Sequence, residues 1–528
     1  MARPNLPAGG GNLSRRTFLA GSGLALSSAF LAACGSGGSA VPAASGAAAG
    51  SARQGGTLRI ARPPASKAET LDPASSLSAY EYLGALYSRL VKLNESGVVQ
   101  PDLAVSWEMS SDAKTWTFDL RDGVSWHDGK PFTAQDVVYT VQHILDPATK
   151  SPQAGVLSSF ISGKSVAAKG TSAVVFTLAS PNAEFASLMA GYNCYIIPNG
   201  SAASIGTSGI GTGPFKLESF RAAGPGRVVR NDSYFGPKPK LDAIEFSSIS
   251  DTQARVNALL AGQVDLISQT NLDYATAQTV LASPVATVAS VKNAQWYTVP
   301  MLNTSAEFKD PRVRQALAHA YNPKDVLQLG VHGSGTIARN NPVPPTEAYY
   351  LDHGLEYDPE KAKWLLNQAG RSSFALDIYT SSYDSVLTPL ALALKGSVEK
   401  AGITLNVKNS SADSYYTDVW MKKPLMTSYW YTGRPIDQLL NQIFRSGSSY
   451  NENAYSNPRF DQTLNAARAT VDDAKRKTLY QDAQKLLIDD GGSLTPFFAD
   501  RLVGISKKVA GYKEYGFEFD YLNIGLAG

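Results

Sequence analysis

Apolar and polar residues alternate most clearly in the stretch Thr115–Arg121. The apolar side chains of this stretch share one face, which predicts a β-strand that is buried on that face. Residues 57–61 alternate in the same way and predict a second strand, and residues 174–178 predict a third.

Helical spacing of apolar residues interrupts these strands. Residues 80–91 and 255–260 show it, and each stretch predicts a helix. Thr133 has the character of an N-cap, with Asp136 three residues later. A helix is expected to begin there and to end before Pro147.

Beyond Asn303 the pattern changes to helices with clear N-terminal caps. In three places a capping side chain precedes a proline at the first helical position, where the missing N–H costs nothing. These pairs are Asp310-Pro311, Asp358-Pro359 and Asn457-Pro458. Strands expected at Ala375–Tyr379 and Ile403–Val407 alternate with the helices. This order predicts an α/β lobe whose strands are mostly parallel.

The N-terminus reads as an export signal. Arg15 and Arg16 precede an apolar run that is too short, and too rich in small residues, to span a bilayer. The residues that end on Cys34 resemble the lipobox of bacterial lipoproteins, which implies cleavage before Cys34 and a lipid on its sulfur. An ordinary signal peptide with a chance cysteine is the alternative. The twin-arginine route is expected, and ordinary export stays open because Ala20 stands where a lysine often follows.

The charge balance changes once the export segment is set aside. The 528 residues carry 48 basic and 45 acidic side chains, a net charge of +3. Three arginines lie in the export segment, so the body holds 45 basic and 45 acidic residues. A neutral body gives no reason to expect a nucleic-acid partner. After lipidation of Cys34 only Cys194 remains, so no intramolecular disulfide is expected.

Motifs for catalysis are missing from the sequence. It contains no G-x-S-x-G elbow, no H-E-x-x-H pair and no phosphate-cradling loop. Ser111 and Lys114 have a serine–lysine spacing, but no K-T-G partner accompanies them. The five histidines form no i, i+4 pair, although histidines far apart in sequence can still converge on nickel or haem. We predict no enzyme activity, no cofactor and no metal.

Two blocks resemble a known family. They run from Leu103 to Glu108 and from Thr115 to Val137, and the second reads TWTFDLRDGVSWHDGKPFTAQDV. They resemble the signature of the family 5 solute-binding proteins, which are the oligopeptide-, dipeptide- and nickel-binding receptors of ABC importers. Further matches occur in the right order along the chain at Thr70–Pro73, Gly211–Phe215, Val313–Leu317 and Tyr357–Ala362.

This resemblance implies an α/β, two-lobed fold of the periplasmic-binding-protein type (type II), with an extra mainly β subdomain in the first lobe. The lobes would be joined by two chain crossings, expected near 297–303 and 495–498, and would close over a buried ligand for a permease to recognise. The expected parts are an export signal at 1–33, Cys34 and a flexible Gly/Ser/Ala tether at 34–54, lobe I at 55–84 and 208–298, the inserted subdomain at 85–207, lobe II at 299–496, and a return to lobe I at 497–528.

In the second lobe, peptide-binding members carry a tryptophan followed by an acidic residue that pairs with the ligand's amino terminus. Trp430 and Tyr431 match the aromatic part, whereas the acidic position falls at about Gly433 and is lost. Arg434 stands beside it, and an arginine in a closed cleft favours a carboxylate or phosphate. Two alternatives stay open. Arg434 either binds ligand or pairs with Asp437 or caps a helix, and Asp437 either binds ligand or caps the helix that follows.

In the first lobe, the loop after residue 73 matches a ligand-lining segment of the family. This match nominates Ser76, Ser78 and Tyr80, although Tyr80 has the alternative of a core position. Gln269, just after an expected short strand, matches another such segment.

The resemblance therefore implies a substrate-binding lipoprotein of an ABC importer, which captures a peptide-like or other small polar solute. Because Arg434 replaces the acidic anchor, the ligand is expected to carry an anionic or strongly accepting group. The expected partners are a permease with its ATPase and, through the lipid, the outer face of the cytoplasmic membrane, with the protein a monomer. A sensory receptor on the same fold stays open, as does an exported hydrolase, which is disfavoured because no nucleophile–base pair is visible.

Overall fold

The computed structural model of the protein describes residues 51–65, 69–371, 374–412, 414–490, 492–515 and 518–528. The expected export signal, Cys34 and most of the tether lie outside these residues. Within the described ranges, no helix has the length and apolar character needed to cross a membrane.

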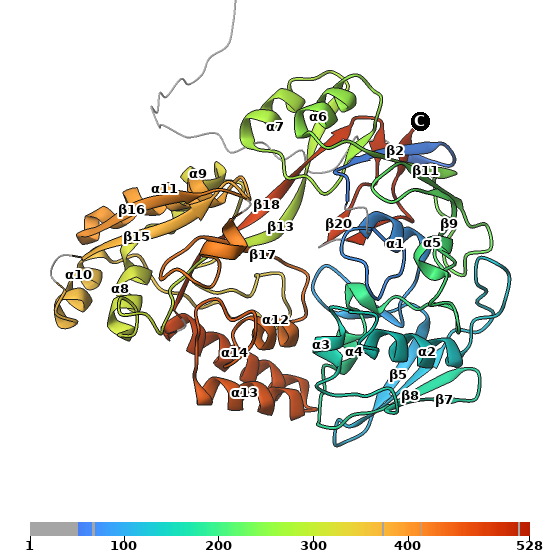
Figure 1. The fold of residues 1–528 in the computed structure, drawn as a ribbon, viewed down its shortest axis with the longest axis horizontal. Coiled ribbons are helices and arrows are strands. Elements are labelled where there is room, and N and C mark those ends of the chain that lie inside the picture. Colours follow the sequence, from blue (N-terminus) through green and yellow to red (C-terminus); the bar gives the residue numbers. More distant parts are fainter. Residues whose placement is uncertain (1–50, 66–68, 372–373, 413, 491, 516–517) are drawn as a thin grey trace, which may run out of the picture. The chain divides into compact units, whose positions relative to one another are not determined.

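A nine-stranded sheet forms the centre of the fold (Figure 1). Its order is β17-β13-β18-β12-β2-β11-β10-β9, with β14 added beside β18. Strand β2 runs parallel to β11 and β12, and the other neighbours are antiparallel. The strand expected at 57–61 is confirmed as β2. The bounds are β2 Thr57–Arg62, β9 Phe215–Phe220, β10 Gly226–Arg230, β11 Ala243–Ser248, β12 Leu266–Ile267, β13 Ala286–Pro300, β14 Gly335–Ile337, β17 Ser428–Tyr431 and β18 Ser493–Ser506.

Strands β13 and β18 are the longest in this sheet, and they run side by side from one lobe to the other (Figure 1). We call the described residues before 292 and after 500 the first lobe, and residues 295–499 the second lobe. In the first lobe, residues 286–291 of β13 pair with 501–506 of β18. In the second lobe, residues 295–300 pair with 493–499, and β17 pairs with the opposite edge of β13.

The pairing of the two long strands is interrupted between Val291 and Gln295. Asn293 adopts a φ of +50° within this bulge, a conformation uncommon for a residue other than glycine. Asp500 fastens the bulge, because its carboxylate accepts the Asn293 N–H at 3.0 Å and the Lys292 ammonium at 2.6 Å. The bulge thus lies where the chain passes between the lobes.

The first lobe carries an inserted subdomain with its own antiparallel sheet, in the order β5-β6-β8-β7. These strands span Ala104–Met109, Thr115–Leu120, Ala173–Thr177 and Val166–Lys169. Helix α2 (Ala134–Leu145) packs on this sheet, and its capping box is present because Asp136 accepts the Thr133 N–H at 2.7 Å. The predicted strands and helix of this region are therefore confirmed.

The helix predicted at residues 80–91 is too long. Helix α1 covers Tyr80–Leu86, and the chain then becomes extended toward the short strand β3 (Val91–Leu93). The physical reason is a contact with the turn at residues 211–215. The Leu86 carbonyl accepts the Gly213 N–H at 2.8 Å, and a Cβ on Gly211 would lie 1.9 Å from that oxygen. Glycine lets this turn seat against the helix end.

The second lobe contains the proline-started helices that the sequence predicted. Helices α8 (Pro311–Ala320), α10 (Pro359–Gln368) and α13 (Pro458–Ala469) each follow a side chain that accepts a backbone N–H of the first turn. Strands β15 (Phe374–Ser381) and β16 (Ile403–Ser410) are parallel, as expected. The expectation of mostly parallel strands is wrong for the rest of this lobe, because both β17 and β18 pair antiparallel to β13.

Candidate ligand-binding cleft

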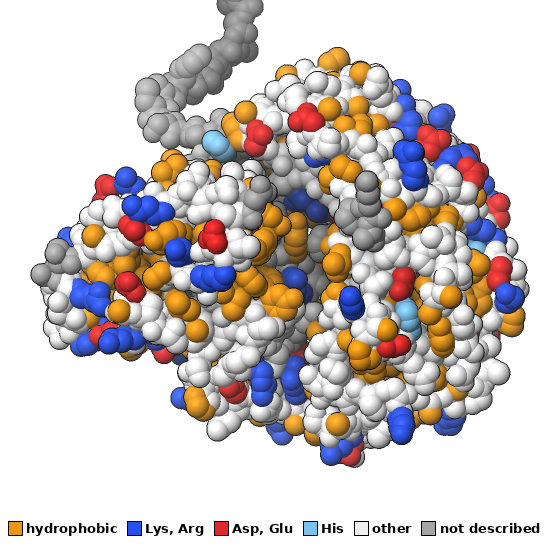
Figure 2. Space-filling view, in the orientation of Figure 1, with side chains coloured by type: hydrophobic (Ala, Val, Ile, Leu, Met, Phe, Trp, Pro, Cys, Tyr) orange, Lys and Arg blue, Asp and Glu red, His pale blue; other side chains and the backbone are white. Residues whose placement is uncertain are grey.

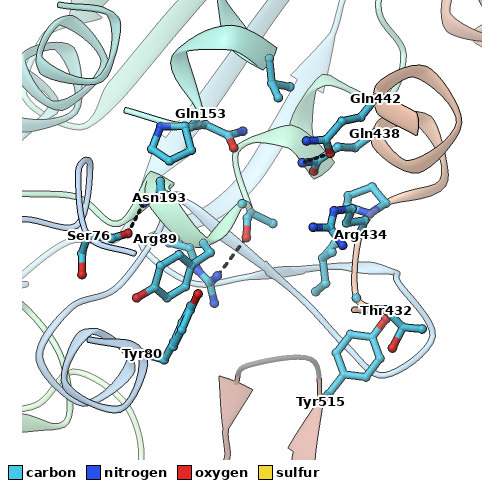
Figure 3. Close-up of a pocket in the computed structure, with 18 of the residues that line it drawn as sticks. Ser76, Tyr80, Arg89, Gln153, Asn193, Thr432, Arg434, Gln438, Gln442 and Tyr515 are labelled. Atoms are coloured by element: carbon cyan, nitrogen blue, oxygen red, sulfur yellow. Dashed lines mark hydrogen bonds between the residues drawn. The ribbon is translucent and has the colours of Figure 1, made fainter. Parts of the chain in front are cut away.

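A cavity of about 250 Å³, the first cavity, lies between the lobes. Figure 2 shows the molecule hollowed here, with basic side chains in the hollow. In Figure 3, Arg434, Gln438 and Gln442 face Tyr80 and Arg89 across the space. The polar lining consists of Ser76, Tyr80, Arg89, Gln153, Tyr192, Asn193, Thr432, Arg434, Gln438, Gln442 and Tyr515.

A second cavity of about 590 Å³ adjoins the first. The two share the lining residues Pro152 and Val156 from the inserted subdomain and Gln438 and Gln442 from helix α12 (Ile436–Ile443). The further polar lining of the second cavity consists of Ser159, Ser180, Asn441, Arg445, Ser446, Ser448, Ser449, Asn465 and Arg468. Among the described residues that line either cavity, there is no Asp or Glu.

Arg434 enters the first cavity from the turn between β17 and α12. Gly433 adopts a φ of +88°, and this left-handed turn brings the arginine back over Trp430. Its Nη1 donates to the Tyr431 carbonyl at 2.6 Å, and its guanidinium carbon lies 5.4 Å from the Trp430 ring centre. Arg434 forms no ion pair with any described residue, and burial lowers the pKa of its guanidinium. The cleft therefore holds a desolvated cation that lacks a counter-charge.

Trp430 is held from behind by Glu452, which the sequence did not indicate. The Trp430 Nε1–H donates to one Glu452 oxygen at 3.0 Å, and Ser428 donates to the other at 2.5 Å. The Trp420 Nε1–H also donates to Glu452. Burial raises the pKa of this carboxyl. With Trp296 stacked behind it at 6.4 Å, the Trp430 ring is fixed as the support for Arg434.

Tyr80 and Ser76 lie in the first cavity, opposite Arg434. Tyr80 is half-buried at the start of α1, with its ring centre 4.6 Å from that of Tyr192. Burial raises the pKa of the Tyr80 hydroxyl to about 12, and the nearby Tyr431 adds to this shift. The structure thus brings Tyr80 and Arg434 together, and the loop of Tyr431 with them.

Ser78 and Gln269 are placed elsewhere. The Gln269 amide donates to Glu81 at 2.6 Å and, more weakly, to the Ser78 carbonyl at 3.4 Å, and neither residue lines the cavity. Glu81 is fully buried in the first turn of α1. Gln269 therefore positions the helix that carries Tyr80, and its contact with ligand, like that of Ser78, stays a prediction.

Asp437 does not cap helix α12, which corrects one of its two predicted roles. It is fully buried in the first turn of α12, where Pro435 takes the N-cap position, so it neither caps this helix nor lines the cavity. Its carboxylate accepts the Arg468 Nε–H at 2.7 Å and the Tyr480 hydroxyl at 3.0 Å. The arginine that pairs with Asp437 is therefore Arg468, and the predicted alternative of an Arg434–Asp437 pair is wrong.

The two lobes also touch at the edge of the cleft. Arg476 of helix α14 (Asp473–Asp490) forms an ion pair with Glu184 of the inserted subdomain at 2.6 Å. Both side chains are largely buried. Burial raises the pKa of Glu184 to about 7, against the opposing effect of Arg476. No group of three or more described His, Cys, Asp or Glu side chains is arranged to hold a metal ion.

Comparison with known proteins agrees with this architecture. The family model for bacterial extracellular solute-binding proteins, family 5 Middle, matches residues 98–473. The dipeptide-binding protein of Escherichia coli is 28% identical over 477 residues, which cover 81% of this chain and 86% of that protein. Heme-binding protein A of Haemophilus influenzae is 27% identical over 472 residues, which cover 82% and 85%.

Solved structures support the same fold. The periplasmic binding protein DppA of Helicobacter pylori, in complex with the peptide STSA, has a TM-score of 0.72 at 25% identity, covering 90% of this chain and 99% of that one. The substrate-binding protein CtaP of Listeria monocytogenes has a TM-score of 0.80 at 23% identity, covering 90% and 100%, and shows the fold alone. The two-lobed fold class predicted from the sequence is confirmed.

Proposed function

This chain belongs to the bacterial extracellular solute-binding proteins of family 5, and we propose that it captures a peptide-like solute with an anionic group for an ABC importer. The solute binds between the lobes, and the closed protein presents it to a permease driven by an ATPase. The protein acts as a monomer and makes or breaks no covalent bond. Relatives that are named for binding dipeptides and glutathione support the peptide-like class.

One observation carries the anionic part of this proposal. Arg434 lies in a cleft whose described lining holds no acidic residue, and its guanidinium has no carboxylate partner there. A desolvated arginine binds a carboxylate or phosphate through two parallel, charge-assisted hydrogen bonds. Tyr80 lines the first cavity opposite this cation, and its aromatic ring suits the apolar part of a small solute. Trp430 supports Arg434 from behind and lines neither cavity.

For its location, we propose export by the twin-arginine route and a lipid on Cys34. The support is the sequence alone: Arg15 and Arg16 before a short apolar run, and small residues leading to Cys34. A lipid at the start of a Gly/Ser/Ala tether would keep the binding body near the permease on the outer face of the membrane.

Mass spectrometry of the solute that co-purifies with the protein tests this function. We expect a small molecule with at least one carboxylate or phosphate, covalently unchanged after release, and uptake of that molecule should be lost when the gene is deleted. A neutral solute would contradict the anionic assignment. A chemically altered solute, or unchanged uptake in the deletion strain, would contradict the transport function.

A further inference from the structure

A second arginine without an acidic partner lies in the same cleft. Arg445 lines the second cavity and is half-buried. Its Nη1 donates to the side-chain oxygens of Asn441 and Asn465, both at 2.9 Å. These amides are neutral, and Arg445 forms no ion pair with any described residue. They orient the guanidinium without cancelling its charge.

The two cavities that hold Arg434 and Arg445 adjoin each other along one face of helix α12, which lines both of them. Gln438 and Gln442 line both cavities, and they are four residues apart, so they stand one above the other on that face. Arg434 precedes the helix and Arg445 follows it. The cleft therefore presents a guanidinium at each end and two neutral amides between them.

The net charge of this wall is positive. The other basic residue that lines the second cavity, Arg468, is paired with the buried carboxylate of Asp437 at 2.7 Å. Because neither cavity has an acidic residue in its described lining, Arg434 and Arg445 keep their full charge toward the cleft. Two uncompensated cations in a confined space favour a ligand with matching negative charges.

We propose that Arg445 is a second anion-binding subsite and that the ligand is an elongated molecule with an anionic group near each end. This inference rests on the proposed function, in which Arg434 binds the first anion. Helix α12 lies between the two arginines, and its 8 residues rise about 12 Å, to which the flanking turns add. Gln438 and Gln442 would then contact the polar middle of the ligand.

The alternative role of Arg445 is structural. By bonding Asn441 of α12 and Asn465 of α13, it can brace the two helices against each other. That role would make Arg445 matter for stability and leave the preference among ligands unchanged. The two roles are therefore separated by comparing ligands that differ in a single charge.

N-succinyl-triglycine and N-butyryl-triglycine form such a pair. They have the same length, and only the succinyl compound has a carboxylate at both ends. Its span is roughly 15 Å, at about 3.5 Å for each glycine plus the succinyl group. We expect calorimetric titration of the ligand-free protein to give a Kd for the succinyl compound about tenfold or more below that of the butyryl compound.

Arg445→Gln should reduce this ratio to about twofold or less, and Arg445→Lys should preserve much of it because the charge remains. The control is Arg459→Gln, which removes an exposed arginine of the same lobe that lines neither cavity. Melting temperatures of the ligand-free variants report any loss of the brace. If Arg445→Gln fails to fold, the ratio of the two Kd values in the parent and in Arg445→Lys still tests whether the second carboxylate is recognised.

Equal affinity of the parent for the two compounds would overturn the second subsite, and so would an unchanged ratio in Arg445→Gln or failure of the succinyl compound to bind. These results leave the proposed function intact if the co-purified solute still requires Arg434. If the co-purified solute binds equally well without Arg434, the proposed function, and with it the anionic assignment, would be contradicted.

Discussion

Replacing Arg434 with alanine separates a ligand-binding arginine from a structural one. The guanidinium has five N–H donors, and its Nη1 donates to the Tyr431 carbonyl. The other donors face a cleft without acidic side chains in its described lining. If a ligand anion takes two of them, Arg434→Ala removes both bonds and leaves that anion desolvated and unpaired.

The expected loss of binding energy is about 3–5 kcal/mol, the cost of half-breaking a buried charged pair. This corresponds to an affinity lower by roughly a hundredfold to several thousandfold. Stability should respond differently. Because the arginine has no acidic partner among the described residues and burial lowers its pKa, the ligand-free protein holds this charge at a cost. Removing it should change the free energy of unfolding by less than about 1 kcal/mol, because loss of the contact with Trp430 and of the hydrogen bond to the Tyr431 carbonyl is offset by removal of the buried charge.

Calorimetric titration with the co-purified solute measures the first effect, and urea unfolding of the ligand-free protein measures the second. Arg434→Lys should restore part of the affinity, because the charge returns without the fork geometry, and Arg459→Ala is the control. A Kd within about threefold of the parent's, well under 1 kcal/mol, would remove Arg434 from the site. A marked loss of stability with unchanged affinity would make it a structural residue.

Three further outcomes are expected. Asp437→Asn should destabilise the protein by about 3–5 kcal/mol in urea unfolding, because Arg468 loses its buried carboxylate; a loss under about 1 kcal/mol would contradict this. Burial raises the pKa of Glu184 to about 7, above its unfolded value, so the folded state binds the extra proton and its contribution to stability falls as pH rises from about 5 to 7. Glu184→Gln should flatten that slope in unfolding experiments, and an identical slope would argue against it. Cys34→Ser should move the protein from the membrane fraction to the soluble fraction, and unchanged membrane association would exclude the lipid anchor.

Local signals made the helix starts and the strands of the inserted subdomain predictable. The Thr133–Asp136 box and the proline-started helices need only neighbours within one turn, and alternation in β6 reports one buried face. The end of α1 was predicted too late, because its terminal carbonyl is satisfied by Gly213, far away in sequence. Such tertiary partners leave no local pattern.

At the site too, residues with a local sequence signal were predicted, and partners that are distant in sequence were not. Trp430 and Arg434 were found through the resemblance, whereas the partner of Asp437 lies 31 residues further on, at Arg468. Glu452 was missed because nothing in its own neighbourhood marks it as the support of an indole 22 residues away. Gln438 and Gln442 did carry a signal. Their i, i+4 spacing places two amides on one helical face beside an arginine-containing turn.

The bulge at Asn293 gives the two lobes a defined point of bending. A ribbon of two paired strands resists flexing wherever its hydrogen bonds are continuous, and at the lobe boundary the pairing of β13 and β18 is interrupted from Val291 to Gln295; a second shift of register, between Tyr297 and Val299, lies within the second lobe. Motion about this point would alter every distance across the cleft, such as that from Tyr80 to Arg434. It would leave the separation of Arg434 and Arg445 unchanged, since one helix joins them. If Arg434 and Arg445 bind the two ends of a ligand, as proposed above, the second lobe alone sets the length of that ligand, whatever the angle between the lobes.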